Sequence, residues 1–154
     1  MDISINSVVV LQVEAQLKTN SLIDNICVYA DAKKTHTVAL IVPLKDQLQK
    51  YAEKISAGYS HMSFDELCKD DKIVEVRRKL SVVSILSLQA VRGTLTEHGR
   101  AGGLEKFEVP TRLTLISSPW TPDMGLVTAA FKLKRKEIQK AYQADIDRMY
   151  NVSN

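Results

Sequence analysis

Two runs of apolar and β-branched residues near the start of the chain place the strongest constraint on its fold. Residues 22–30 (LIDNICVYA) and 36–42 (HTVALIV) have the composition of β-strands, and only a short polar link separates them. This spacing predicts an antiparallel hairpin. The second run is almost continuously apolar, which predicts a strand covered on both faces, and Pro43 ends it because proline cannot donate a ladder hydrogen bond.

The rest of the sequence predicts helices and one more strand around this hairpin. Apolar residues three and four apart give residues 45–55 one helical face, and Ser63 followed by Glu66 forms a capping-box pattern. In chain order, the expected elements are helices at 13–18, 45–55 and 63–80, a strand at 112–117, and a final helix at 134–150 whose apolar stripe is Ile138, Tyr142, Ile146 and Met149.

Residues 81–91 (SVVSILSLQAV) are atypical, because they carry no charge and show no clear helical period. They are either a buried strand or an inserted piece of helix. The sequence Arg92-Gly93-Thr94 is expected to break this segment, and Ala101-Gly102-Gly103 to form a flexible joint. Together the elements predict a mixed α+β domain over residues 13–150, after a lead-in at 1–12 and before a short tail at 151–154.

Composition excludes several classes of protein. The net charge of +3 over 154 residues is too small to indicate a nucleic-acid binder, and the basic residues 77–79 read as a hydrated helix face. Two cysteines, Cys27 and Cys68, do not make a disulfide framework and indicate a reducing compartment. Three scattered histidines show no metal-ligand spacing. The sequence shows no signal peptide and no apolar run of the roughly 18–20 residues that span a bilayer.

Residues 120–135 (WTPDMGLVTAAFKLKR) join a stiff turn to a group of cations. Two prolines bracket Trp120, and Gly125 relaxes the turn at its tip. A short segment then leads to Lys132 at the start of a basic helix. This arrangement presents one cation to a phosphate or carboxylate that another group holds.

The charges of the last helix run against its macrodipole. Lys134, Arg135 and Lys136 crowd its start, whereas Asp145 and Asp147 lie nearer its end. Each misplaced charge costs about 0.3–1 kcal/mol, so the pattern favours an anion site at the helix start. An ordinary surface helix with hydrated lysines explains the local pattern equally well. Contact with nucleic acid is disfavoured, because the cluster lacks interleaved aromatic residues and a broad basic face.

Several segments resemble a known family. VEAQLKTNSLIDNICVYAD from Val13, THTVALIVP from Thr35, the long stretch LTEHGRAGGLEKFEVPTRLTLISSPWTPDMGLVTAAFKLKRKEI from Leu95, and YQADIDRMY from Tyr142 are similar to the C-terminal domain of long-chain fatty acyl-CoA synthetases. These enzymes belong to the adenylate-forming (AMP-binding) superfamily. The resemblance covers most of residues 13–150, apart from 81–91. It implies the small C-terminal domain of that superfamily, with a short β-hairpin and a small sheet flanked by helices.

The resemblance also implies a reaction and a set of residues. ATP and a fatty acid form an acyl-adenylate and pyrophosphate, and CoA then displaces AMP to give acyl-CoA, with Mg²⁺ on the nucleotide phosphates. Lys132 matches the lysine that serves the adenylation step, and Lys134 and Arg135 are candidates to face nucleotide or CoA phosphates. No residue of the chain is implied as a metal ligand. The motif loop comprises Trp120, Thr121, Gly125 and Thr128.

The resemblance has limits that shape the expected function. The family's large adenylation domain, with its ATP, acyl and Mg²⁺ sites and its membrane anchor, has no counterpart in these 154 residues. We therefore expect a fragment that is inactive alone. Members of the family are found at the endoplasmic reticulum, lipid droplets or the mitochondrial outer membrane, and we expect membrane association only through the absent part. The alternatives are a non-catalytic module that presents a basic helix start to CoA, a partner protein or an anionic membrane, or a chain too apolar on one face to be stable by itself.

Overall fold

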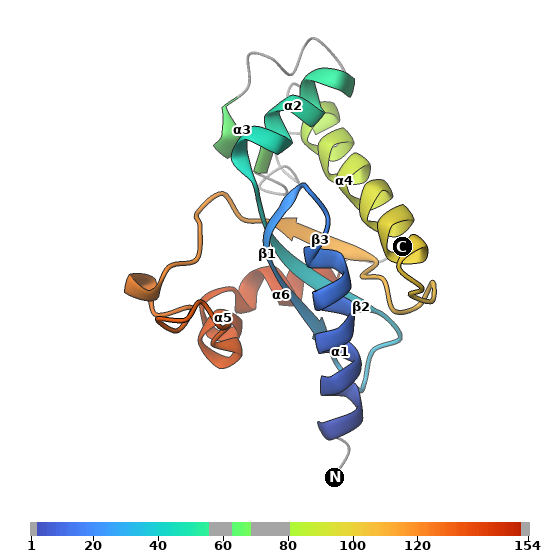
Figure 1. Cartoon of the computed structure of the whole chain (residues 1–154), viewed down its shortest axis with the longest axis vertical. Helices are drawn as coiled ribbons and strands as arrows, with labels where there is room; N and C mark the ends of the chain where they lie inside the picture. The colour runs from blue at the N-terminus through green and yellow to red at the C-terminus, as the bar shows by residue number, and fades with distance from the viewer. Residues whose placement is uncertain (1–2, 56–62, 69–80, 152–154) are drawn as a thin grey trace.

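A three-stranded sheet forms the centre of the molecule. The computed structural model describes residues 3–55, 63–68 and 81–151 (Figure 1). Strand β2 (Thr37–Pro43) lies in the middle, antiparallel to β1 (Ile23–Ala30) and parallel to β3 (Arg112–Leu115). The predicted hairpin is therefore confirmed. The third strand is also confirmed, although it ends two residues earlier than expected.

The central strand is covered on both faces, as its apolar composition predicts. Successive side chains of a strand point to opposite faces. Leu40 and Ile41 accordingly enter different apolar clusters, and both are fully buried. The register pairs Cys27 with Leu40 and Leu40 with Thr114, so the neighbouring strands hold β2 along its length.

Helices pack on both faces of this sheet. Figure 1 shows α1 (Ile3–Lys18) in front of the sheet and α6 (Gln143–Asn151) behind it. The front cluster joins the sheet to α1, α2 (Lys45–Ile55), α3 (Phe64–Cys68) and α4 (Ser81–Ala101). We call the other cluster the rear core; it joins the sheet to α5 (Arg135–Ala141), α6 and the loop before them, and consists of Cys27, Val38, Leu40, Val42, Ile116, Trp120, Leu126, Val127, Ile138, Ile146 and Met149.

Two of the expected helices begin where the sequence places them. Helix α2 has the bounds predicted from its apolar face. Helix α3 starts with the predicted capping box: the Glu66 carboxylate accepts the Ser63 N–H at 2.8 Å, and the Ser63 hydroxyl accepts the Glu66 N–H at 3.3 Å. The expected continuation of this helix to residue 80 and the basic residues 77–79 lie outside the described residues.

Two other helices are longer than the sequence predicts. Helix α1 begins ten residues before the expected start at Val13, because Val9 and Val10 pack against the front cluster and favour the helix despite their β-branched side chains. The segment 81–91 is helical, so the strand alternative is wrong. The expected break at Gly93 is also wrong, because α4 runs through it to Ala101.

The final helix is divided in two at Tyr142. The sequence predicts one helix over 134–150, but α5 ends at Ala141 and α6 begins at Gln143. Tyr142 has φ −116° and ψ 23°, outside the helical range. The predicted apolar stripe nevertheless remains on one side, since Ile138, Ile146 and Met149 are all buried in the rear core.

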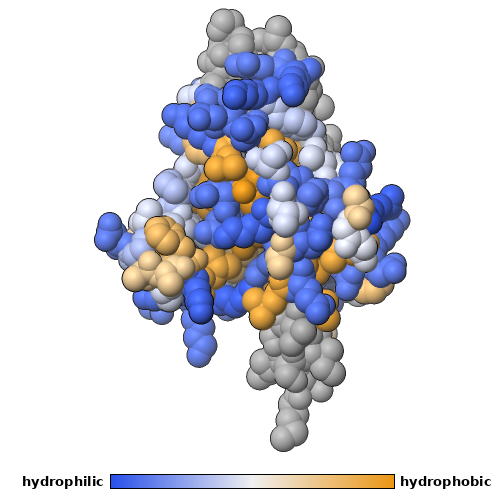
Figure 2. Space-filling view, in the orientation of Figure 1, coloured by the Kyte–Doolittle hydropathy of each residue, from blue (hydrophilic) through white to orange (hydrophobic). Residues whose placement is uncertain are grey.

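Some large hydrophobic side chains stay exposed. Figure 2 shows hydrophobic residues in several places on the face in view, between larger hydrophilic areas. Among the described residues, the exposed large hydrophobic side chains are Leu11, Leu44, Phe107, Met124 and Phe131. Two of them, Met124 and Phe131, belong to the segment that carries Lys132, which gives this part of the surface an apolar as well as a basic character.

Candidate functional site

Lys132 lies in a tight loop closed by backbone hydrogen bonds. An isolated antiparallel bridge joins Val127 to Leu133, and the Lys134 N–H donates to the Leu126 carbonyl at 2.9 Å. Inside this bridge, the Thr128 N–H donates to the Lys132 carbonyl, also at 2.9 Å. Residues 126–134 therefore form a small closed hairpin, which we call the lysine loop.

Thr128 holds the turn of the lysine loop with both its backbone and its side chain. Its carbonyl accepts the Phe131 N–H at 2.8 Å, and its hydroxyl accepts the Lys132 N–H at 3.1 Å. Phe131 has φ 57°, in the left-handed region that non-glycine residues seldom adopt. This bend turns the chain sharply just before the lysine, and the Phe131 ring remains 61% exposed.

The Lys132 side chain extends into solvent. It is exposed, and its ammonium makes no hydrogen bond or ion pair with any other described residue. A lysine ammonium is a compact charge on a flexible stem. Lys132 is therefore an exposed cation on a backbone that hydrogen bonds hold in place.

The segment that enters the lysine loop is fixed by burial. Trp120 is only 3% exposed, and its indole N–H donates to the Tyr142 hydroxyl at 3.3 Å. A single 3₁₀ turn, η3 (Pro122–Met124), follows the predicted proline-containing loop, with Thr121 before it and Gly125 after it. Gly125 has φ 71° and donates its N–H to Pro122, so glycine closes this turn as expected.

Arg135 differs from the other cations near the lysine loop because its side chain turns inward. The guanidinium forms an ion pair with Glu14 of α1, and it donates to the Val28 carbonyl at 3.3 Å. It also approaches the Cys27 sulfur at 3.7 Å. The sequence makes Arg135 a candidate to face a phosphate. In this structure its guanidinium is engaged by Glu14 and Val28, while the residue also lines a basic groove beside the lysine loop.

Glu14 is the residue of this region that sequence reasoning missed. It is 7% exposed, and its carboxylate accepts the Val28 N–H at 2.6 Å as well as the Arg135 hydrogen bond. Burial raises the pKa of the Glu14 carboxyl, while these two donors act in the opposite direction. The signal available in the sequence is its spacing: Leu17 lies three residues later, which puts Glu14 on the buried side of the helix.

A basic groove of ≈ 850 Å³ lies beside the lysine loop. It is bounded by the end of the proline-containing turn and by one side of α5. Lys134, Lys136 and Lys140 line it together with Glu137, and all four side chains are exposed. Lys134 begins α5 without a capping side chain. Arg135 lines the groove as well, although its guanidinium is paired with Glu14. The groove therefore gathers four cations next to the loop that presents Lys132.

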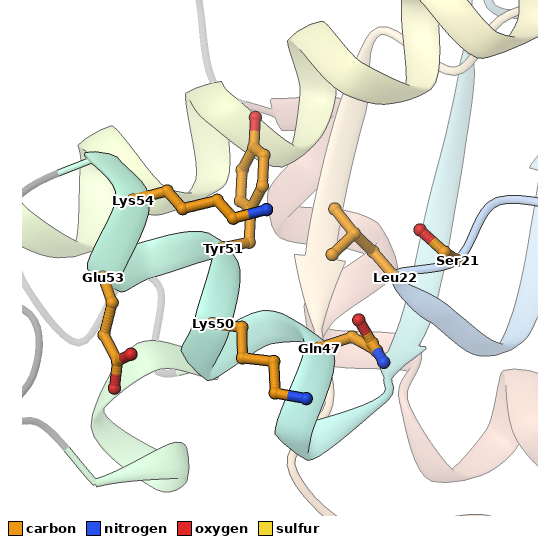
Figure 3. Close-up of a pocket in the computed structure, with 7 residues that line it drawn as sticks. All are labelled: Ser21, Leu22, Gln47, Lys50, Tyr51, Glu53 and Lys54. Atoms are coloured by element: carbon orange, nitrogen blue, oxygen red, sulfur yellow. The ribbon is translucent and has the colours of Figure 1, made fainter.

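A second hollow, of ≈ 410 Å³, lies against α2 (Figure 3). Lys50, Glu53 and Lys54 of α2 are among the residues that line it. Tyr51 forms part of its wall and shares a hydrogen bond of 2.7 Å with Thr94 of α4. None of the predicted site residues lines this hollow.

Other chemistry-bearing residues are dispersed in the described parts of the chain. No three His, Cys, Asp or Glu side chains there come close enough to hold a metal ion. Cys27 and Cys68 are both buried free thiols, and burial raises the pKa of Cys27 to about 11 and that of Cys68 to about 12. Among the same residues, no helix is both long and apolar enough to cross a bilayer.

Sequence comparisons identify relatives that are several times longer than this chain. No protein-family model matches the chain. It is 40% identical over 139 residues to long chain acyl-CoA synthetase 8 of Arabidopsis thaliana, an alignment that covers 90% of this chain and 17% of that protein. It is 32% identical to long-chain-fatty-acid–CoA ligase 1 of Schizosaccharomyces pombe, over 90% of this chain and 18% of the relative. The ligase 1 of Saccharomyces cerevisiae is also 32% identical, over 92% of this chain and 19% of the relative.

Solved structures share the fold. The adenylation domain of a carboxylate reductase from Mycobacterium chelonae superposes with a TM-score of 0.68 at 19% identity, over 93% of this chain and 18% of that one. The A domain of a carboxylic acid reductase from Segniliparus rugosus gives a TM-score of 0.66 at 20% identity, over 92% of this chain and 18% of that one. The α+β fold predicted from the sequence is confirmed. The chain is therefore identified as a member of the long-chain acyl-CoA synthetase family that corresponds to a segment of 17–19% of the length of these relatives.

Proposed function

We propose that this chain is the C-terminal lid domain of a long-chain fatty acid–CoA ligase and supplies Lys132 to the adenylation step. The observation that carries the proposal is the lysine loop, which fixes the backbone at Lys132 while its ammonium stays exposed and unpaired among the described residues. The sequence relatives support the class of reaction, since their names describe them as long-chain acyl-CoA synthetases or fatty acid–CoA ligases.

The proposed role of Lys132 is electrostatic. When a fatty acid carboxylate attacks the α-phosphate of ATP, two anionic groups approach each other and charge builds up on the phosphorus oxygens. A positioned ammonium relieves that repulsion most strongly in the transition state. A side chain that contributes in this way is worth roughly 10²–10³ in rate. The flexible stem lets the cation follow the oxygens, while the closed loop limits the volume that it samples.

The other parts of the reaction belong, in this proposal, to the remainder of a full-length synthetase. We place the ATP, Mg²⁺ and acyl sites in a large adenylation domain against which this domain moves. Lys134 is the candidate for a second phosphate contact, because it lines the basic groove beside the lysine loop. Attachment to the endoplasmic reticulum, lipid droplets or mitochondria would likewise depend on that remainder.

The direct test combines this chain with a large adenylation domain from one of the relatives. We expect the mixture to form acyl-adenylate, measured by ATP–pyrophosphate exchange, and the chain alone to form none. Lys132→Ala should lower the rate roughly 10²–10³-fold with little change in the KM for ATP. Lys106→Ala makes the same change in charge at an exposed position outside the groove and serves as the control. Equal rates for the Lys132 and Lys106 variants would reject the proposed role.

The basic groove favours a second candidate, a non-catalytic module that binds an anionic partner. Lys134, Lys136 and Lys140 would attract CoA, an acidic protein or an anionic membrane through long-range electrostatics. The chain should bind CoA or vesicles that contain phosphatidylserine, and about 0.5 M salt should abolish this binding. Such a result would support this function. Absence of binding at low salt would rule it out.

A further inference from the structure

The segment that leaves the lysine loop makes several polar contacts at Arg135. This residue follows Lys134, whose N–H closes the loop against Leu126. Its guanidinium contacts Glu14 and the Val28 carbonyl, as described above, and its own carbonyl accepts the Tyr29 hydroxyl at 3.1 Å. Arg135 is thus fixed at its side chain and at its backbone, only three residues after Lys132.

Glu14 connects this anchor to the rest of the molecule. One carboxylate oxygen accepts the Val28 N–H of β1, and the other accepts Arg135. The carboxylate therefore ties together α1, the edge strand of the sheet and the start of α5. Because Glu14 is 93% buried (7% exposed), it depends on these partners for the hydrogen bonds that water would otherwise supply.

The entering and leaving segments of the lysine loop are held by different interactions. Leu126 and Val127 enter through the rear core, at 6% and 1% exposure. The leaving segment has Leu133, which is only partly buried, and then the ion pair of Arg135. Loss of the ion pair would consequently loosen the leaving side of the loop more than the entering side.

We infer that Glu14 and Arg135 are a positioning pair that fixes the leaving side of the lysine loop and thereby sets where the Lys132 cation lies. The catalytic meaning of this inference rests on the proposed function, but its structural part does not. In this view Arg135 acts on anionic substrates only through Lys132.

The structural part is tested on the 154-residue chain by amide hydrogen exchange. In Glu14→Gln, Glu14→Asp and Arg135→Lys, the Lys132 and Lys134 N–H groups should exchange about tenfold faster or more, while Leu40 in the central strand keeps its rate. Glu14→Asp retains the charge and shortens the side chain, so it gives a result even if Glu14→Gln fails to fold.

The matched control is the ion pair between Asp145 and Arg148, which lies within one turn of α6. Arg148→Lys should leave exchange in the lysine loop unchanged. Loop exchange that is unaffected in the Glu14 and Arg135 variants would overturn the inference. Equal acceleration of the loop and of Leu40 would overturn it as well, because the pair would then stabilise the whole fold rather than the loop.

The catalytic part is tested in the mixture with a large adenylation domain. Glu14→Asp should lower kcat with little change in KM. Arg135→Lys should also lower kcat but keep part of the rate of the unmodified chain, because it keeps the charge. In a Lys132→Ala background, Glu14→Asp should cause no further loss, since the pair acts through Lys132. A further loss there would overturn the inference. If exchange in the loop rises but kcat stays unchanged in both single variants, the positioning pair stands and the proposed role of Lys132 fails.

Discussion

The same substitution should have opposite effects at Gly125 and Gly93. An alanine Cβ would meet no atom within 4 Å at either position, so packing does not decide the outcome. The backbone does: Gly125 has φ 71° where it ends η3, whereas Gly93 lies inside α4. Gly125→Ala should therefore lower the free energy of unfolding, and Gly93→Ala should raise it.

The magnitudes follow from the two conformations. An L-residue in the left-handed region costs about 1–2 kcal/mol, and the loss of flexibility in the unfolded chain returns about 0.4–1 kcal/mol. The net loss for Gly125→Ala is then about 1 kcal/mol. In a helix interior, alanine is favoured over glycine by about 0.8–1 kcal/mol. The two variants should differ by about 2 kcal/mol, or about 4–8 °C in Tm for a chain of this size.

Urea unfolding followed by far-UV circular dichroism measures both variants against the unmodified chain. The slope with urea should not change, so that the shift in midpoint reports stability. The reasoning is refuted if both variants shift in the same direction, or if Gly125→Ala is at least as stable as the unmodified chain. Gly93→Ala also tests the finding that α4 continues through residue 93, because a break there would remove the gain.

Three further measurements concern the rear core. Ile138→Ala should lower the free energy of unfolding by about 2–5 kcal/mol because Ile138 is fully buried, and a loss below about 1 kcal/mol in urea unfolding would contradict its packing. Tyr142→Phe removes the acceptor of the Trp120 N–H and should cost about 1 kcal/mol, with a smaller effect in a Trp120→Phe background if the bond is the cause. Burial raises the pKa of Cys27 from 9.0 to about 11, so between these pH values the unfolded chain releases a proton that the folded chain keeps. Stability should fall by up to about 2–3 kcal/mol as the pH rises through this window, and Cys27→Ala should remove that part of the slope; identical slopes would refute it.

Local sequence signals predicted the hairpin, the third strand and several helix boundaries correctly. The β-branched composition of β2 and the short link before it were sufficient for the hairpin, because both are local properties. The Ser63–Glu66 capping box was also predictable, since its two hydrogen bonds join residues three apart. The parallel pairing of β3 with β2 has no comparable local signal.

Structural features that depend on tertiary contacts could not be predicted from local sequence signals. The charge pattern groups Arg135 with the exposed lysines, yet its ion-pair partner Glu14 lies 121 residues away in the chain. The division at Tyr142 could not be read from the sequence for a related reason. Ile138 and Ile146, on either side of it, keep the spacing of one continuous helical face, so the apolar period continues through the break. Residues 81–91 lack charge and period, and their helix could not be distinguished from a strand.

The parallel pair β2–β3 has a consequence for the order in which the molecule folds. The Thr111 N–H, just before β3, donates to the Thr37 carbonyl of β2 across 74 residues, whereas the β1–β2 hairpin closes over a short link. Loop-closure entropy makes the distant pairing the slower event. The rear core needs residues that follow β3, so it can assemble only after the C-terminal third has been synthesised. We therefore expect the hairpin to form early on the ribosome, and the lysine loop to be among the last parts of the chain to acquire its final position.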